Sequence, residues 1–265
     1  MFKSVRIYAL LAALFLLAAC QGTGVKFLSG NHGNLRGEAL TVSALLFQPD
    51  GKGPFPAVVL LYTCGGYQRH VTEGWPSFLT KNGYVVLTVD SYPPRGFQTC
   101  DKAGSRIHWM GAQADDAFAA LDYLAGLGNV DSDRVGVMGF SAGAFAINEM
   151  IVSMNRREGR MRTFRAAISL YGACRGLGLF YSKEYLPLMQ IAGELDEHLA
   201  PSCVDAGKTT SMVVHLLENT YHAFDQPQIT DIRYDNAGNP MRYSPSATTR
   251  AENLTKEFFA KHLGK

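Results

Sequence analysis

The chain has 265 residues, of which 47% are hydrophobic and 18% are charged, and these proportions are typical of a soluble enzyme with one domain. Its formal net charge is +2, but residues 1–19 hold Lys3 and Arg6 and no acidic residue, so the chain without them has a formal charge of 0. The composition therefore excludes the basic surplus that nucleic-acid binding requires.

Residues 1–19 have the pattern of a secretion signal. Lys3 and Arg6 form a positive segment, residues 7–17 form an apolar segment, and the run Leu17-Ala18-Ala19-Cys20 follows. The apolar segment is short for a membrane-spanning helix. The four residues that end at Cys20 resemble the lipobox of bacterial lipoproteins, which implies that Cys20 becomes the acylated first residue. The alternatives are an ordinary cleaved signal with an incidental cysteine, or an uncleaved anchor.

Acylation of Cys20 would attach the protein to a membrane without a spanning segment, because each buried methylene group of a lipid contributes about 0.8 kcal/mol. Gln21 follows this cysteine, and the resemblance to lipoproteins then implies the outer membrane, facing the periplasm. We therefore expect a lipid-anchored protein of the bacterial cell envelope, with a signal peptide over residues 1–19, a tether over residues 20–39 and one domain over residues 40–265.

Four further cysteines, an even number, follow the signal. In the oxidising compartment to which a secreted chain is sent, disulfides persist, so two bridges are expected. Three connectivities are possible, and the pairing of Cys64 with Cys100 and of Cys174 with Cys203 is favoured because each pair follows neighbouring predicted strands. Buried free thiols are the alternative.

The expected domain alternates short apolar runs with longer segments of helical spacing. Thr41–Phe47 predicts a first strand, and the turn residues 49–54 predict a hairpin-like entry to the next. Further strands are predicted at Ala57–Tyr62, Val85–Asp90, Arg134–Gly139, Ala166–Tyr171, Leu188–Gly193 and Met212–Leu217. Helices are predicted at Thr72–Asn82, Trp109–Leu127, Ala142–Met154 and Ala247–Leu263. This alternation indicates an α/β fold with a mostly parallel central sheet covered by helices on both faces.

Ser141 is the candidate nucleophile. It lies in Gly139-Phe140-Ser141-Ala142-Gly143, a G-x-S-x-G pattern that directly follows a predicted strand and opens a predicted helix. In a chain with 27 glycines the five letters alone are weak evidence, and the strand before and the helix after them make the pattern specific. A nucleophile elbow holds its serine in a strained turn, and the two glycines leave room for that turn.

A serine hydroxyl needs a histidine to take its proton and a carboxylate to orient that histidine. His222 lies between the last predicted strand and the terminal helix, and Asp196 directly follows the preceding strand. Ser141, Asp196 and His222 thus follow the chain order of α/β-hydrolases. Glu194 and Glu197 flank Asp196 and are alternative carboxylates.

The other histidines are less well placed for this role: His32, His70, His108, His198, His215 and His262. His198 stands beside two acids but has no ligand from a second segment, so no metal site is predicted. His215 is expected to be packed within a strand, whereas His70 and His108 are candidates to line the pocket. Arg95 either binds a substrate carboxylate or forms a structural ion pair.

Three motifs resemble the dienelactone hydrolase family of α/β-hydrolases, from about Leu40 to the C-terminus. They are the elbow at Ser141, the segment Gly193–Pro201, and Tyr221–Asp225, which contains His222. The resemblance implies a cofactor-free hydrolase of the α/β-hydrolase fold. The enzymes that gave the family its name carry cysteine at the elbow, so the serine of this chain points to an esterase-like member and does not carry over lactone specificity.

The developing oxyanion of such a reaction needs two backbone N–H donors. Ala142, the residue after the nucleophile, supplies the first. The second is expected in Tyr62–Gly66, which resembles the H-G-C-G-G loop of the family and points to the amide of Cys64. Tyr62 and Thr63 stand where the family has His-Gly.

These residues predict a cofactor-free serine hydrolase of small carboxylic esters or lactones, with an acyl-enzyme on Ser141. A peptidase or amidase on the same fold is one alternative, because elbow and triad are common to both. A surface-tethered binding lipoprotein without turnover is another, since a fold does not prove an activity. The acyl and alcohol groups of the substrate and the oligomeric state stay open.

Overall fold

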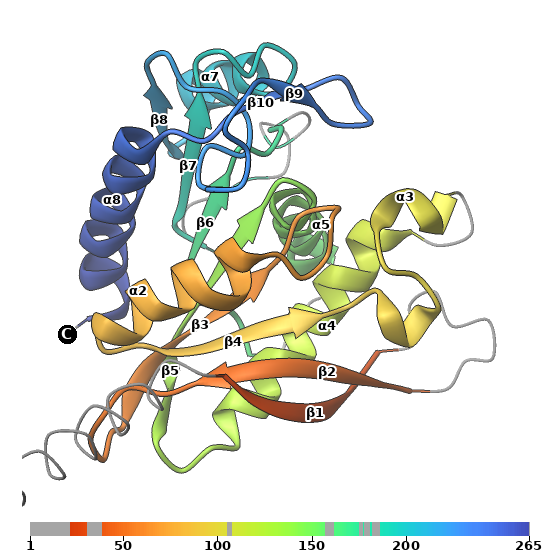
Figure 1. Ribbon diagram of the computed structural model, residues 1–265. Helices are drawn as coiled ribbons and strands as arrows, with labels where there is room; N and C mark the ends of the chain where they lie inside the picture. Colours follow the sequence, from red (N-terminus) through yellow and green to blue (C-terminus); the bar gives the residue numbers. More distant parts are fainter. Residues whose placement is uncertain are drawn as a thin grey trace, which may run out of the picture.

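The computed structural model describes residues 22–30, 39–104, 108–156, 162–174, 177, 181 and 186–264. Its centre is an eight-stranded sheet in the order β1-β2-β4-β3-β5-β6-β7-β8 (Figure 1). The strands are β1 (Thr23–Ser29), β2 (Leu40–Phe47), β3 (Phe55–Leu61), β4 (Val85–Asp90), β5 (Val130–Phe140), β6 (Ala166–Leu170), β7 (Leu188–Gly193) and β8 (Val213–Leu217). The pairs β1–β2 and β2–β4 are antiparallel and the other five pairs are parallel. The predicted, mostly parallel α/β sheet is thus confirmed.

Helices cover both faces of this sheet (Figure 1). They are η1 (His70–Gly74), α2 (Trp75–Lys81), η2 (Pro93–Arg95), α3 (Cys100–Ala103), α4 (Trp109–Ala125), α5 (Ala142–Arg156), α7 (Ala200–Thr209) and α8 (Pro245–Leu263). A small second sheet pairs β9 (Arg233–Tyr234) with β10 (Pro240–Met241). No helix in the described ranges combines the length and hydrophobicity needed to cross a membrane.

The two core layers follow from the period of two along each strand. In β3, Val59 and Leu61 pack into the layer under α4 and α5, whereas Val58 and Leu60 pack into the layer under α2 and α8. All four side chains are at most 1% exposed. The strand therefore reads as a continuous apolar run, as expected of a parallel strand with helices on both sides.

The N-terminal edge of the sheet differs from the expectation. Residues 23–29, assigned from the sequence to the tether, form β1 and pair with β2 over their whole length. Phe27 is 9% exposed and the neighbouring Leu28 is 68% exposed, because only one face of this edge strand is covered. A strand with polar residues among its apolar ones lacks the continuous apolar run from which the inner strands were predicted.

The predicted hairpin at residues 49–54 was wrong. β2 pairs with β4, and β3 lies on the far side of β4. The chain therefore uses this turn to cross from the antiparallel edge of the sheet into its parallel interior.

Arg95 forms a structural ion pair. Its guanidinium donates to both carboxylate oxygens of Asp116 on α4, at 2.8 and 2.9 Å, and to the carbonyl oxygen of Ser91 at 2.7 Å. The two charged side chains are 1% and 0% exposed. The hydroxyl of Ser29 on β1 also donates to Asp116. The pair thus links the edge strand, the segment after β4 and a covering helix, and Arg95 is not in a position to meet a substrate.

We expect Arg95→Ala to lower the free energy of unfolding by about 3–5 kcal/mol, because the variant leaves the Asp116 carboxylate buried without its cation. Urea denaturation measures this change. Arg69→Ala is the matched control, since Arg69 pairs with Glu73 on the surface, where the side chains are 78% and 58% exposed and an ion pair contributes little. Equal losses in the two variants would contradict the structural role of the buried pair.

Candidate active site

Ser141 occupies a sharp turn between β5 and α5. Its φ is 50°, in a region that residues with a side chain adopt only under strain. A Cβ atom at Gly139 would overlap the carbonyl of Gly143, and one at Gly143 would overlap the carbonyl of Leu61 on β3. Both glycines of the G-x-S-x-G pattern are therefore required by close backbone approaches, and the turn directs Ser141 to the carboxyl end of the sheet.

Three side chains predicted from separate motifs meet at this end of the sheet. The Ser141 hydroxyl lies 3.1 Å from Nε2 of His222, and Nδ1 of His222 lies 2.7 Å from Oδ2 of Asp196. His222 is 2% exposed and Asp196 is fully buried. With Nδ1–H donating to the carboxylate, Nε2 is free to accept the serine proton. Glu194, one of the alternative carboxylates, instead accepts the amide of Asn219.

The loops that carry Asp196 and His222 are packed directly against each other. The amide of Leu195 donates to the carbonyl of Thr220 at 2.8 Å. A Cβ atom at Gly193 would overlap that same carbonyl oxygen, so only glycine permits this approach after β7. The glycine of the Gly193–Asp196 segment thus brings Asp196 to His222 although 26 positions separate them.

A hairpin that the sequence did not reveal holds the backbone of His222. The amide of His222 donates to the carbonyl of Pro240 at 3.0 Å, the amide of Arg242 donates to the carbonyl of His222 at 3.3 Å, and His222 forms a parallel bridge with Met241. The hairpin comprises residues 233–241 and contains β9 and β10. Its turn residues Asp235 and Gly238 were the available signal, but two-residue strands are too short to stand out in a sequence.

A second buried carboxylate supports the ring of His222. Asp225 accepts the Trp75 indole N–H at 2.7 Å and the Tyr171 hydroxyl at 2.8 Å. The Tyr171 ring meets the His222 imidazole edge-on, with centroids 4.8 Å apart. Burial, and then the charge of Asp225, raise the pKa of Tyr171 well above its usual value, so the phenol keeps the proton that it donates. None of these three supporting residues was identified from the sequence.

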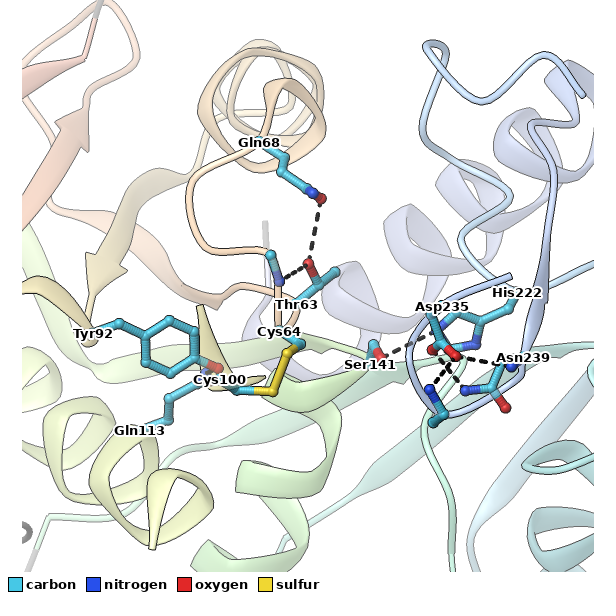
Figure 2. The surroundings of a disulfide bond; sticks show 12 residues. Thr63, Cys64, Gln68, Tyr92, Cys100, Gln113, Ser141, His222, Asp235 and Asn239 are labelled. Atoms are coloured by element: carbon cyan, nitrogen blue, oxygen red, sulfur yellow. Dashed lines mark hydrogen bonds between the residues drawn. A yellow bond between two sulfur atoms is a disulfide. The ribbon is translucent and has the colours of Figure 1, made fainter. Parts of the chain in front are cut away.

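Ser141 and His222 face a cavity of about 760 Å³. Figure 2 shows Ser141 between the loop of Cys64 on one side and His222 with Asp235 on the other. Residues 63–65 and Ala142 also line this cavity, so the two predicted oxyanion amides belong to segments beside the nucleophile. The loop is ordered internally, because the Thr63 hydroxyl accepts the amide of Gly65 at 3.1 Å.

Two disulfides are present, in the pairing favoured from the sequence. Cys64 is bonded to Cys100, and Cys174 to Cys203, with Cα atoms 4.8 and 4.6 Å apart. The first bridge lines the active-site cavity (Figure 2), and the amide of Cys100 also donates to the carbonyl of Cys64 at 3.0 Å. The second bridge joins α7 to the segment after β6. Cys20 lies outside the described residues, so its acylation stays a prediction.

Three of the other histidines bear on the cavity prediction. His198 lines the cavity, whereas neither His70 nor His108 does. His70 is 2% exposed, packs edge-on against Phe140, and has its pKa lowered by burial. His108 is half exposed, with Nε2 3.8 Å from a carboxylate oxygen of Glu149. The expectation that these two line the pocket was therefore wrong.

One cluster of possible metal ligands occurs within the described ranges, formed by Cys64, Cys100 and Asp101. Its two sulfur atoms are joined to each other, so they offer no thiolate to a metal. His32, another histidine of the sequence, lies outside the described residues.

Residues 42–263 match the model of the dienelactone hydrolase family. Dipeptidyl aminopeptidase BIII of Pseudoxanthomonas mexicana is 29% identical over 100 residues, which cover 37% of this chain and 14% of that protein. Acyl-coenzyme A thioesterase 5 of Mus musculus is 29% identical over 148 residues, which cover 55% of this chain and 31% of that protein. The chain thus spans less than one third of either relative.

Among solved structures, the fold is similar to that of a dienelactone hydrolase-like promiscuous phosphotriesterase, P91, from metagenomic libraries. The TM-score is 0.65 at 18% identity, and the match covers 91% of this chain and 99% of the other. At this identity the likeness concerns the fold.

We expect Tyr171→Phe to lower the free energy of unfolding by about 1–3 kcal/mol, because it leaves one oxygen of the buried Asp225 carboxylate without its hydroxyl donor. Urea denaturation measures the loss. Tyr234→Phe is the control, since Tyr234 is 69% exposed and we expect a change within about 0.5 kcal/mol. An unchanged stability of Tyr171→Phe would show that the bond to Asp225 contributes nothing net.

Proposed function

Since the chain belongs to the dienelactone hydrolase family, we propose that it is a serine hydrolase that cleaves carboxylic esters or lactones through an acyl-enzyme on Ser141. The observation that carries the proposal is the hydrogen-bonded series from Ser141 through His222 to the buried Asp196, at 3.1 and 2.7 Å. That series stands at a strained turn beside a cavity of substrate size.

In the first half of the reaction, Oγ of Ser141 attacks the carbonyl carbon and Nε2 of His222 takes the hydroxyl proton. Asp196 keeps the ring oriented through Nδ1–H and stabilises the imidazolium that forms. When the tetrahedral intermediate collapses, the C–O bond to the alcohol breaks and His222 returns the proton to the departing alkoxide. The acyl group then remains bonded to Ser141.

The oxyanion is assigned to the backbone amides of Cys64 and Ala142. Ala142 is the first residue of α5, and the initial N–H groups of a helix have no partner within it. Cys64 lines the same cavity as Ser141, and its loop is held by the disulfide to Cys100. Donors fixed before the reaction need no reorganisation when the charge develops.

In the second half, His222 takes a proton from water and the resulting hydroxide attacks the acyl-enzyme. The same two amides hold the second oxyanion, and the proton returns to Ser141 as the carboxylic acid departs. Every step uses groups of this chain.

Amide hydrolysis is the second candidate function, because a relative that matches part of the chain is an aminopeptidase. The elbow and triad serve both reactions, so matched ester and peptide substrates separate them. A binding protein without turnover is the remaining alternative, and labelling of Ser141 by a fluorophosphonate argues against it if labelling occurs.

We expect Ser141→Ala to lower kcat/KM for p-nitrophenyl acetate by about 10⁴–10⁶-fold and to abolish fluorophosphonate labelling. Asp196→Asn should cost about 10⁴-fold in kcat, because the wrong tautomer of His222 is then held. Spectrophotometric assay of purified variants measures both effects.

Ser153→Ala is the matched control, because Ser153 lies on the same helix and its hydroxyl donates to the carbonyl of Met150. This variant should retain activity. Turnover that persists in Ser141→Ala would refute the proposed nucleophile, and a folded protein with neither labelling nor turnover would favour the binding class.

We expect the double variant Cys64→Ser/Cys100→Ser to lose about 10²-fold in kcat/KM, near the lower end of what the loss of one oxyanion donor costs. Cys174→Ser/Cys203→Ser is the control: it should lose about 2–5 kcal/mol of stability but keep kcat/KM per folded molecule. Active-site titration corrects both for unfolded protein. Equal activity in the two variants would contradict the link between the first bridge and the oxyanion amide.

A further inference from the structure

The lining of the cavity at Ser141 has an apolar part and a polar part. If the serine-hydrolase function proposed above holds, on which this inference rests, these two parts indicate a substrate class. We propose that the substrate is a neutral ester that joins an apolar acyl group to a sugar or similar polyol. The acyl group lies against Trp109 and Phe145, and the polyol lies against carboxamides of the polar lining, which include Asn236 of the 233–241 hairpin.

The apolar wall starts one helical turn from the nucleophile. The amide of Phe145 donates to the carbonyl of Ser141 at 3.1 Å, and its ring meets Trp109 edge-on with centroids 6.5 Å apart. Both rings are half-buried and line the cavity. Ala173 and Leu199 also line it. A hydrocarbon chain leaving the ester carbonyl would therefore find apolar surface beside Ser141.

The cavity is also lined by carboxamides that retain hydrogen-bonding capacity, and they lie on both sides of Ser141. Oε1 of Gln68 accepts the Thr63 hydroxyl at 3.3 Å, which leaves its amino group available. Nε2 of Gln228 donates to Gln226 at 3.0 Å, which leaves its carbonyl oxygen available. Asn236 is exposed at the turn of the hairpin. A carboxamide both donates and accepts without carrying charge, and a sugar hydroxyl has the same capability.

These groups flank the nucleophile. Figure 2 shows Gln68 above the Cys64 loop on one side of Ser141, and the hairpin residues Asp235 and Asn239 beside His222 on the other. The Asp235 carboxylate accepts the amides of Ala237 and Asn239, at 2.9 and 2.8 Å, and the Asn239 side chain at 2.7 Å. The Asp235 carboxylate is therefore occupied by hydrogen bonds within the turn. These bonds order the turn and hold Asn236 in a fixed place.

The charged residues that the structure describes around the cavity do not favour an anionic substrate. Arg233 is the one arginine or lysine among the described residues that line the cavity, and it is exposed at the rim. Two aspartates, Asp101 and Asp235, line the same cavity. Arg95 is enclosed with Asp116. Within the described part of the chain, a substrate carboxylate would thus meet one arginine, in solvent, where the interaction is weak.

The experiment compares four butyrate esters that share one acyl group: those of p-nitrophenol, 1-propanol, glucose and glycolate. We expect kcat/KM for the glucose ester to exceed that for the propyl ester by about tenfold, the effect of one or two net hydrogen bonds. The glycolate ester, which carries a carboxylate, should be the poorest of the three unactivated esters.

Two variants and one control locate the recognition. Gln228→Ala/Asn236→Ala should lower the ratio of kcat/KM for the glucose ester over the propyl ester by about tenfold. Gln48→Ala removes an exposed carboxamide outside the cavity and should leave that ratio unchanged. Trp109→Ala should lower the preference for butyryl over acetyl glucose by about tenfold, because two methylene groups lose their apolar wall.

The outcomes separate this inference from the proposed function. If p-nitrophenyl butyrate is hydrolysed with Ser141 dependence but propyl and glucose esters react equally, the substrate class is overturned and the serine hydrolase stands. If the glycolate ester is preferred and Arg233→Gln removes that preference, anion recognition replaces polyol recognition. If no ester reacts and Ser141 takes up no fluorophosphonate, both proposals fail together.

Discussion

The backbone of Ser141 is held in a conformation that its side chain disfavours, and the elements around it supply the contacts that keep it there. Its amide donates to the carbonyl of Leu170 on β6 at 3.0 Å, and its carbonyl accepts the amide of Phe145 on α5. The glycines on either side let β5, α5 and β3 approach to backbone contact. Strain of this kind, of order 1–3 kcal/mol, persists only where the surroundings over-determine it. The inner strands next to Ser141, which are covered by helices on both faces, provide such surroundings.

The imidazole of His222 is also held in place, by contacts on several sides. Asp196 holds Nδ1, the hairpin holds the amide and carbonyl of His222, and Tyr171 limits the ring from its edge. Tyr171 itself has a φ of 40°, so a second strained residue follows the strand next to the nucleophile. Rigid placement of this sort reduces the motion that must be lost when a substrate reaches the site.

The parts of the site that the sequence predicted are those tied to the ends of inner strands. Ser141, Asp196 and His222 each follow an apolar run, and the parallel strands bring such positions to one edge. The parts that it missed depend on tertiary pairing. The edge strand β1 has one covered face, and the strands of the 233–241 hairpin are only two residues long. The roles of Arg95 and Asp225 were decided by partners 21 and 150 positions away. No local pattern encodes such separations.

The bonds between the hairpin and His222 also bear on how this architecture can diversify. Loops at the carboxyl edge of a sheet usually change independently of the scaffold, which is how one fold acquires many specificities. Here a segment that lines the cavity is the same segment that holds His222 by its main chain. An exposed side chain of its turn such as Asn236 is free to vary, whereas an insertion or deletion near Pro240 would displace His222. Within this hairpin, a new substrate preference can therefore arise by point substitutions but not by changes of length. Changes of length are tolerated only in segments that do not contact His222.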